Sequence, residues 1–215
     1  MKIIDLTHII DEDMPVFPET KPPVFNRKYT MEEYGFREAE ISMFSHTGTH
    51  IDAPAHMLTD GPTLDELKVE QFIGKAIILD FSNLSQKVIE LKDIVIYEEK
   101  IKEADFIIIK TGWDKYWGSE NYYKKFPALS DEAAQWIVEF KLKGIGIDAI
   151  SIDAMDSVEF TVHKTLLDNR IIIIENLTNL SAVEKESFIL SVMPLKNKLA
   201  DGSPVRAIAI ESMEY

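Results

Sequence analysis

The chain has 215 residues, of which 46% are hydrophobic, and its formal net charge is −14 at pH 7. This length and apolar content suffice for a packed core, and we expect one domain over residues 1–215 that acts on a small molecule. The negative charge repels phosphate backbones and anionic lipid surfaces, which argues against nucleic acid or a membrane as a partner. The chain contains no cysteine, so it has neither a disulfide framework nor a redox thiol.

The N-terminal sequence reaches the acidic residue Asp5 before the apolar core of a signal peptide could form. The longest apolar runs, such as residues 171–174, are far shorter than a membrane span. We therefore expect a cytoplasmic protein.

The first half of the chain is rich in turn residues and in short segments that mix polar and apolar side chains, such as residues 37–43. The prolines that interrupt it are Pro15, Pro18, Pro22 and Pro23. This composition predicts antiparallel strands joined by long connections.

The second half alternates between strand-like and helix-like segments. Short β-branched bursts predict buried strands at residues 77–79, 106–109, 145–147 and 171–174. A helix is predicted over residues 131–140, with Ser130 as its N-cap and Gly144 after it as a stop signal. A weaker helical pattern covers residues 92–102. Together with the strands of the first half, this alternation predicts an α/β fold around a mixed sheet.

Three of the five histidines lie within eleven residues, and an aspartate stands between the second and the third. These residues are His46, His50, Asp52 and His56. Imidazole nitrogens and carboxylates are the ligands that borderline divalent ions prefer, so the segment predicts a metal site. Asp52 would point away from His50 on a helix, and the glycine and proline of the segment disfavour a helix interior. We therefore expect a loop or a strand edge here.

A closed structural zinc site is disfavoured, because such sites depend on thiolates and the chain has none. Histidines and carboxylates with open positions are instead typical of catalytic sites. Further ligands must come from elsewhere in the chain. Glu175 directly follows four isoleucines, where a carboxylate is costly unless it is paired or bound to metal, and His163 lies twelve residues upstream. The spacing of these two residues is also compatible with His163 as a surface histidine and Glu175 as a strand-end residue with an ordinary polar partner.

The sequence from His46 to His56 matches the HxGTHxDxPxH motif of the cyclase family, which includes bacterial kynurenine formamidases and isatin hydrolases. Further segments that resemble the family lie at residues 4–7, 14–15, 110–113, 146–148, 163–167, 175–177 and 202–207. The resemblance implies the family's swivelling β/β/α fold, with a mixed, barrel-like sheet and flanking helices. It also implies a homodimer or a homotetramer.

The resemblance implies a role for each site residue. His46, His50 and Asp52 would bind one divalent metal ion, and Asp52 would bridge to a second ion held by His163 and Glu175. Zinc is the expected metal, with manganese as the alternative. His56 resembles the family's catalytic acid/base, and the alternative is that it serves as a fourth ligand of the first ion.

The implied function is a metal-dependent hydrolase of a small amide, similar to the arylformamidases (kynurenine formamidases) of tryptophan catabolism. The metal would activate the water that attacks the carbonyl, and His56 would transfer the proton. The alternatives are an isatin hydrolase-like lactam or imide hydrolase, a cyclase or dehydratase, and a metal-binding or small-ligand-binding protein without turnover. Phe17 stands where similar formamidases carry a tryptophan that packs on the substrate, so we take it as a substrate-binding residue that lacks the indole donor.

Five aromatic residues follow the predicted strand at residues 106–109 within one short segment. They are Trp113, Tyr116, Trp117, Tyr122 and Tyr123. Packing or an interface is the favoured role, and lining of the pocket is the alternative.

Overall fold

The structure is a computed structural model that describes residues 1–211. Nine strands form its central sheet: β1 (Lys2–Asp5), β4 (His50–Asp52), β5 (Ile73–Asp80), β7 (Phe106–Lys110), β9 (Gly144–Ile147), β10 (Ile172–Glu175), β11 (Ser187–Ser191), β12 (Gly202–Pro204) and β13 (Ile208–Glu211). Their order is β1-β13-β11-β5-β7-β9-β10-β4-β12. The four central strands from β5 to β10 are parallel and the outer pairs are antiparallel, so the sheet is mixed as predicted.

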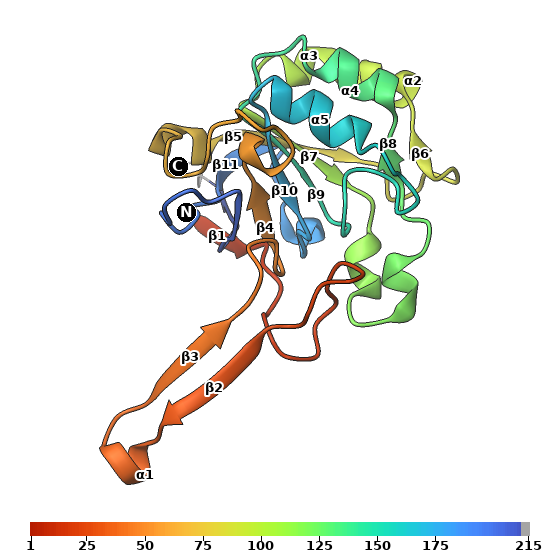
Figure 1. Ribbon diagram of the computed structural model, residues 1–215. Helices are drawn as coiled ribbons and strands as arrows, with labels where there is room; N and C mark the ends of the chain where they lie inside the picture. Colours follow the sequence, from red (N-terminus) through yellow and green to blue (C-terminus); the bar gives the residue numbers. More distant parts are fainter. Residues whose placement is uncertain (212–215) are drawn as a thin grey trace.

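Helices cover one face of the parallel strands (Figure 1). They are α2 (Leu91–Ile94), α3 (Glu98–Ile101), α4 (Asp131–Ile137) and α5 (Thr161–Asp168). Short 3-10 turns lie at Pro54–His56, Val69–Phe72, Val95–Tyr97, Trp113–Tyr116, Glu120–Tyr123 and Leu180–Ala182. A small parallel pair, β6 (Val88–Ile89) and β8 (Ala128–Leu129), lies beside the helices.

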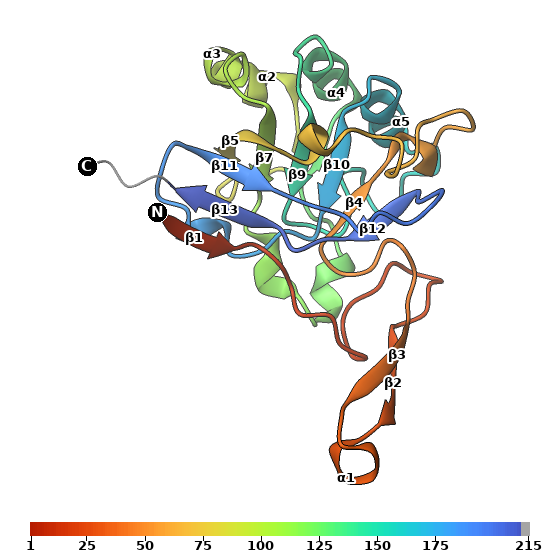
Figure 2. The same ribbon diagram turned by 90° about the vertical axis from the view of Figure 1, so that its left-hand side faces the viewer.

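The parallel strands are buried on both faces. In β7, Ile107 and Ile109 pack in the cluster that contains the helices, whereas Phe106 and Ile108 belong to a second apolar cluster on the other face. The second cluster lies between the central strands and the antiparallel strands, which form a separate layer of the curled sheet (Figure 2). Burial on both faces explains why these strands are continuous apolar runs in the sequence.

All four predicted buried strands are confirmed and lie in β5, β7, β9 and β10, although β10 begins at Ile172, one residue after the predicted start. The helix predicted over residues 131–140 begins as expected, because Ser130 Oγ accepts from the N–H of Ala133 at 3.2 Å. It ends at Ile137, before the predicted end and well before Gly144. The chain returns to the sheet, where the N–H of Lys143 donates to the carbonyl of Asp105 at 2.7 Å. This hydrogen bond between distant residues, and not Gly144, therefore determines the path of residues 138–143.

The segment 92–102 is not one helix. It forms α2, a 3-10 turn and α3 in succession. The turn falls where Ile94, Val95 and Ile96 follow one another, and β-branched side chains have restricted rotamers in a helix. The helix is therefore interrupted at the residues whose side chains least favour a helix.

A hairpin arm projects from the body of the molecule (Figures 1 and 2). It consists of β2 (Val24–Tyr29), the short helix α1 (Met31–Tyr34) and β3 (Glu38–Ser42), and it confirms the antiparallel strands predicted in the first half. No residue of β3 is buried, and Val24, Phe36 and Ile41 are each about half exposed. No helix within residues 1–211 has both the length and the apolar character needed to cross a membrane.

Candidate metal centre

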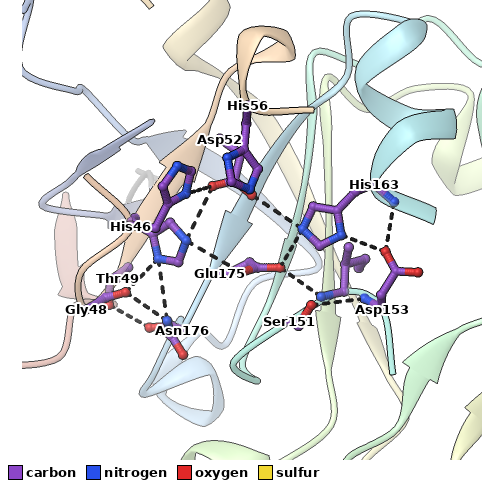
Figure 3. Close-up of polar contacts among 12 residues, drawn as sticks. His46, Gly48, Thr49, Asp52, His56, Ser151, Asp153, His163, Glu175 and Asn176 are labelled. Atoms are coloured by element: carbon purple, nitrogen blue, oxygen red, sulfur yellow. Dashed lines mark hydrogen bonds and ion pairs between the residues drawn. The ribbon is translucent and has the colours of Figure 1, made fainter. Parts of the chain in front are cut away.

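The pairing of β4 with β10 forms the centre of the site. The two strands are antiparallel and place His50 opposite Glu175. His50 and Asp52 are two residues apart on β4, so their side chains lie on the same face of the sheet. His163 approaches from the first turn of α5, and Figure 3 shows the side chains of Asp52, His163 and Glu175 converging. The histidine-rich segment is predicted to be a loop or a strand edge and not an α-helix. It forms β4 and the 3-10 turn at Pro54–His56, and β4 lies between β10 and β12, inside the sheet.

The nitrogen and oxygen atoms of these side chains lie close together. His50 Nε2 is 3.3 Å from Asp52 Oδ1 and 3.5 Å from Glu175 Oε2. His163 Nε2 is 3.2 Å from Glu175 Oε1 and 3.7 Å from Asp52 Oδ2. His46 Nδ1 is 2.7 Å from Asp52 Oδ1. The structure thus brings together all five residues that the sequence proposes as ligands.

Each of the three histidines has an outer acceptor on its second ring nitrogen. His50 Nδ1 lies 2.8 Å from the carbonyl oxygen of Gly48, which can only accept, so Nδ1 carries the proton. His163 Nδ1 lies 2.6 Å from Asp153 Oδ2, and His46 Nε2 lies 3.1 Å from Asp201 Oδ2. Such outer acceptors fix the tautomer and orientation of a metal-binding imidazole. The nitrogen that faces the centre is then free to act as a ligand.

Two features indicate that a cation fits between these residues. Asp52 is 1% exposed, and its Oδ2 has no hydrogen-bond partner among residues 1–211. The lone pair of His50 Nε2 points at carboxylate oxygens that have no proton to offer. A buried polar atom without a partner is costly, and a divalent ion would satisfy both atoms. The mixture of imidazole and carboxylate donors suits zinc or manganese.

When no ion neutralises the carboxylates, the same geometry shifts the pKa values of two of the candidate ligand histidines. Burial lowers the pKa of His46, but the carboxylates of Asp52 and Asp201 outweigh it and raise the value to about 10. Burial likewise opposes charge on His163, while Asp153, Asp52 and Glu175 raise its pKa well above the ordinary value. Because a ligand imidazole must be neutral, loading the site requires the release of protons.

His56 lies beside this cluster in the 3-10 turn after β4. Its ring centroid is 3.9 Å from that of His46, and its Nδ1 is 3.8 Å from Asp201 Oδ2. Burial is the main cause that lowers its pKa; Asp52 and Glu175 oppose this effect, whereas His46 and His163 add to it, and the lowered pKa favours a neutral ring at pH 7. One nitrogen of His56 also lies within 4.8 Å of ligand atoms of His46 and Asp52. The geometry is therefore compatible with either an acid/base or a fourth ligand.

A cavity of about 340 Å³ is lined by His46, His50, His56, His163 and Glu175. Phe17, Phe44 and Phe160 provide aromatic walls, and His56, His163 and Asp201 provide polar groups. The substrate-binding candidate Phe17 is thus on the cavity wall, 37% exposed.

The aromatic residues between 113 and 123 do not line this cavity. They pack against the apolar cluster between the sheet and the helices. Packing, the favoured role for these five aromatic residues, is confirmed. The alternative that they line the pocket is wrong.

Sequence reasoning missed Asp153 and Asp201. Both are single acidic residues in a chain that has 37 of them, so neither has a recognisable pattern. Asp201 had one indirect signal, because Gly202 follows it in a segment that resembles the family. A Cβ on Gly202 would lie 2.5 Å from the His46 ring, so only glycine leaves room for that histidine.

Comparisons with known proteins agree with this fold. The family model described as "Putative cyclase" matches residues 4–154. Kynurenine formamidase from Bacillus cereus is 31% identical over 206 residues, covering 95% of each chain. A solved structure titled a potential metal-dependent hydrolase with cyclase activity is 30% identical, has a TM-score of 0.82, and covers 97% of this chain and 96% of its own.

An isatin hydrolase bound to thioisatinate has a similar fold, with a TM-score of 0.89 over 97% of this chain and 91% of that chain. At 23% identity, this likeness concerns the fold alone. It confirms the expected α/β architecture with its curled mixed sheet and flanking helices. The family model spans most of the chain and includes the histidine-rich segment. The chain belongs to the cyclase family.

Proposed function

We propose that the protein is a metal-dependent hydrolase of a small aryl amide, with arylformamidase-like specificity. The observation that carries the proposal is that Oδ2 of Asp52 is buried without a hydrogen-bond partner among residues 1–211, next to histidines that line an aromatic-walled cavity. The relatives named kynurenine formamidase and metal-dependent hydrolase support the same reaction class.

His46, His50 and Asp52 would hold one divalent ion, and His163 and Glu175 would hold a second that shares Asp52. The separate directions of the two Asp52 oxygens support this division, because Oδ1 faces His46 and His50 while Oδ2 faces His163. Zinc is the proposed metal and manganese the alternative. Such ions lower the pKa of bound water and polarise a carbonyl oxygen.

His56 would transfer the proton to the leaving nitrogen. Its neutral ring lines the cavity beside the ligands and is about a quarter exposed, so a substrate can reach it. Phe17, Phe44 and Phe160 would pack on the aryl group through buried apolar area. The cavity volume is at the small end of the range for small-molecule sites, which favours a compact substrate.

The proposal is tested by turnover of a matched substrate set with the zinc-loaded and the manganese-loaded protein. N-formylkynurenine and formanilide represent aryl formamides, isatin represents the lactam alternative, and a β-hydroxy ketone represents dehydration. We expect hydrolysis of the formamides, and its loss in Asp52→Asn. Turnover of isatin alone, or of the hydroxy ketone alone, would contradict the formamidase specificity, and metal binding without any turnover would leave the non-catalytic alternative.

We also propose that the chain forms a homodimer or homotetramer. The arm supports this, because an isolated two-stranded hairpin is marginally stable in water and this one exposes Val24, Phe36 and Ile41. Light scattering should give at least twice the mass of 24.6 kDa. Phe36→Ser with Ile41→Ser should dissociate the oligomer, whereas a monomeric wild type would contradict the proposal. The absence of cysteine is compatible with the expected cytoplasmic location.

A further inference from the structure

The aromatic segment at residues 113–123 contacts Asn176, the residue that follows Glu175, through the side chain of Tyr122. Tyr122 is fully buried, and its hydroxyl donates to Oδ1 of Asn176 at 2.7 Å. Asn176 directly follows Glu175 and has a left-handed backbone with φ of 57°, which asparagine tolerates better than most residues. It is 5% exposed and lies beside Gly48 and Thr49 in Figure 3.

The side-chain amide of Asn176 is linked to His50 through the backbone carbonyl of Gly48. Its Nδ2 donates to the carbonyl oxygen of Gly48 at 2.9 Å, and the same oxygen accepts from His50 Nδ1 at 2.8 Å. A carbonyl oxygen has two lone pairs, so these two donors saturate it. If the amide were flipped, Oδ1 would face the Gly48 oxygen and repel it. The hydroxyl of Tyr122 therefore stabilises the one orientation in which the Gly48 carbonyl is held for His50.

Tyr122 is itself fixed as a donor. Burial raises the pKa of its phenol well above 10, and the nearby Asp148 and Glu175 act in the same direction, so the hydroxyl keeps its proton. The indole of Trp113 donates to the backbone carbonyl of Tyr122 at 3.0 Å. The ring of Trp117 packs edge-on against the Tyr122 ring, with centroids 5.2 Å apart. The aromatic segment thus holds the phenol in place.

We propose that Tyr122 is a positioning residue for metal binding, which acts through Asn176 and Gly48 to hold His50 with Nε2 directed at Asp52 and Glu175. The hydroxyl lies outside the cavity and touches neither the ligands nor a substrate. This inference rests on the metal-binding part of the proposed function and is independent of the substrate.

The first test compares two variants that each lose one phenol hydroxyl from the same 3-10 turn. Tyr122→Phe removes the donor to Asn176, whereas Tyr123→Phe removes an acceptor for the N–H of Val16 at 3.1 Å. Zinc affinity is measured by competition with a chromogenic chelator. Loss of an outer hydrogen-bond partner costs about 10- to 100-fold in metal affinity, so we expect about a 10-fold loss in Tyr122→Phe and none in Tyr123→Phe. Equal affinities in folded variants would overturn the inference.

A second measurement does not depend on the variants folding. Nitrogen-15 NMR of the histidine rings in the zinc-loaded wild type should show His50 bound through Nε2 and protonated at Nδ1. Binding through Nδ1 would overturn the inference while leaving the proposed function in place. Failure of the wild type to bind zinc or manganese would overturn both, and zinc binding with equal affinity in Tyr122→Phe would overturn the inference alone.

Discussion

Asp153 holds His163 at two points, because its Oδ2 accepts from the backbone N–H of His163 at 2.9 Å and from the ring Nδ1 at 2.6 Å. The other oxygen accepts from the N–H of Val162 at 3.2 Å. One carboxylate therefore caps the first turn of α5 and orients a candidate metal ligand on it. The position of the helix and the direction of the imidazole are fixed by the same side chain.

The first prediction follows from this contact. Asp153→Asn keeps the size of the side chain but removes the negative charge and one acceptor, so we expect metal affinity to fall by about 10- to 100-fold. Competition with a chromogenic chelator measures the change. Asp156→Asn, an exposed position in the same loop, is the control. Unchanged affinity in Asp153→Asn would show that His163 does not need this partner.

The second prediction concerns stoichiometry. Because the two oxygens of Asp52 face different histidines, the loaded wild type should bind two divalent ions per chain. His163→Ala should bind one, since Glu175 and Asp52 alone make a poor second site. Isothermal titration with zinc and with manganese, checked by elemental analysis, gives the counts. A single-site isotherm in the wild type would contradict the two-metal arrangement.

The third prediction separates His56 from the ligands. His56→Ala should keep its metal and lose about 10²- to 10⁴-fold in kcat, the usual scale for a positioned acid or base. His50→Ala should instead lose metal affinity. If His56→Ala is depleted of metal and regains activity when zinc is added, His56 is a ligand and its acid/base role is wrong.

The fourth prediction concerns Phe17 on the cavity wall. Phe17→Trp adds apolar surface and an indole donor, worth on the order of 1–2 kcal/mol in transition-state binding. This should raise kcat/KM for N-formylkynurenine about 5- to 30-fold. Ile96→Trp, at an exposed position that does not line the cavity, is the control. A decrease caused by Phe17→Trp would indicate that the natural substrate is smaller than an aryl formamide.

The fifth prediction is a pH dependence of stability. The ring of His8 stacks on Trp117 with centroids 3.7 Å apart, and burial lowers its pKa to about 4. A depressed histidine pKa stabilises the fold above pH 6.5, and this contribution is lost as the pH falls towards 4. The shift corresponds to at most about 3 kcal/mol, and partial exposure reduces it.

His8→Phe keeps a ring against Trp117 but cannot titrate. Urea unfolding in the presence of a chelator should therefore show the wild type losing more stability than His8→Phe between pH 7.5 and pH 4. Parallel losses in the two proteins would mean that His8 is accessible to solvent in the folded state.

The sequence determined the parts of this protein that depend on short-range patterns. Unbroken β-branched runs predicted the parallel strands, because a strand buried on both faces has no polar side to present. His46, His50, Asp52 and His56 could be grouped because they lie within eleven consecutive residues. His163 and Glu175 were candidates from their position in the sequence, and the resemblance to the family implied their roles. Their convergence is a structural finding, while their roles as ligands and acid/base stay predictions.

The features that depend on strand register and on contacts between distant segments could be determined only from the tertiary structure. His50 faces Glu175 because β4 pairs with β10 across more than one hundred residues of chain, and no local pattern specifies that register. Asp153 has no distinctive sequence context and Asp201 only the indirect signal of Gly202. Asn176 lies in a segment that resembles the family, but nothing in that segment shows its contact with Gly48. These residues join the site only where three separate loops meet around the histidines. The ends of the helices were decided in the same way, since α4 stops where the chain must return to the sheet. Local residue chemistry selects the candidate ligands, whereas non-local packing selects the partners that orient them.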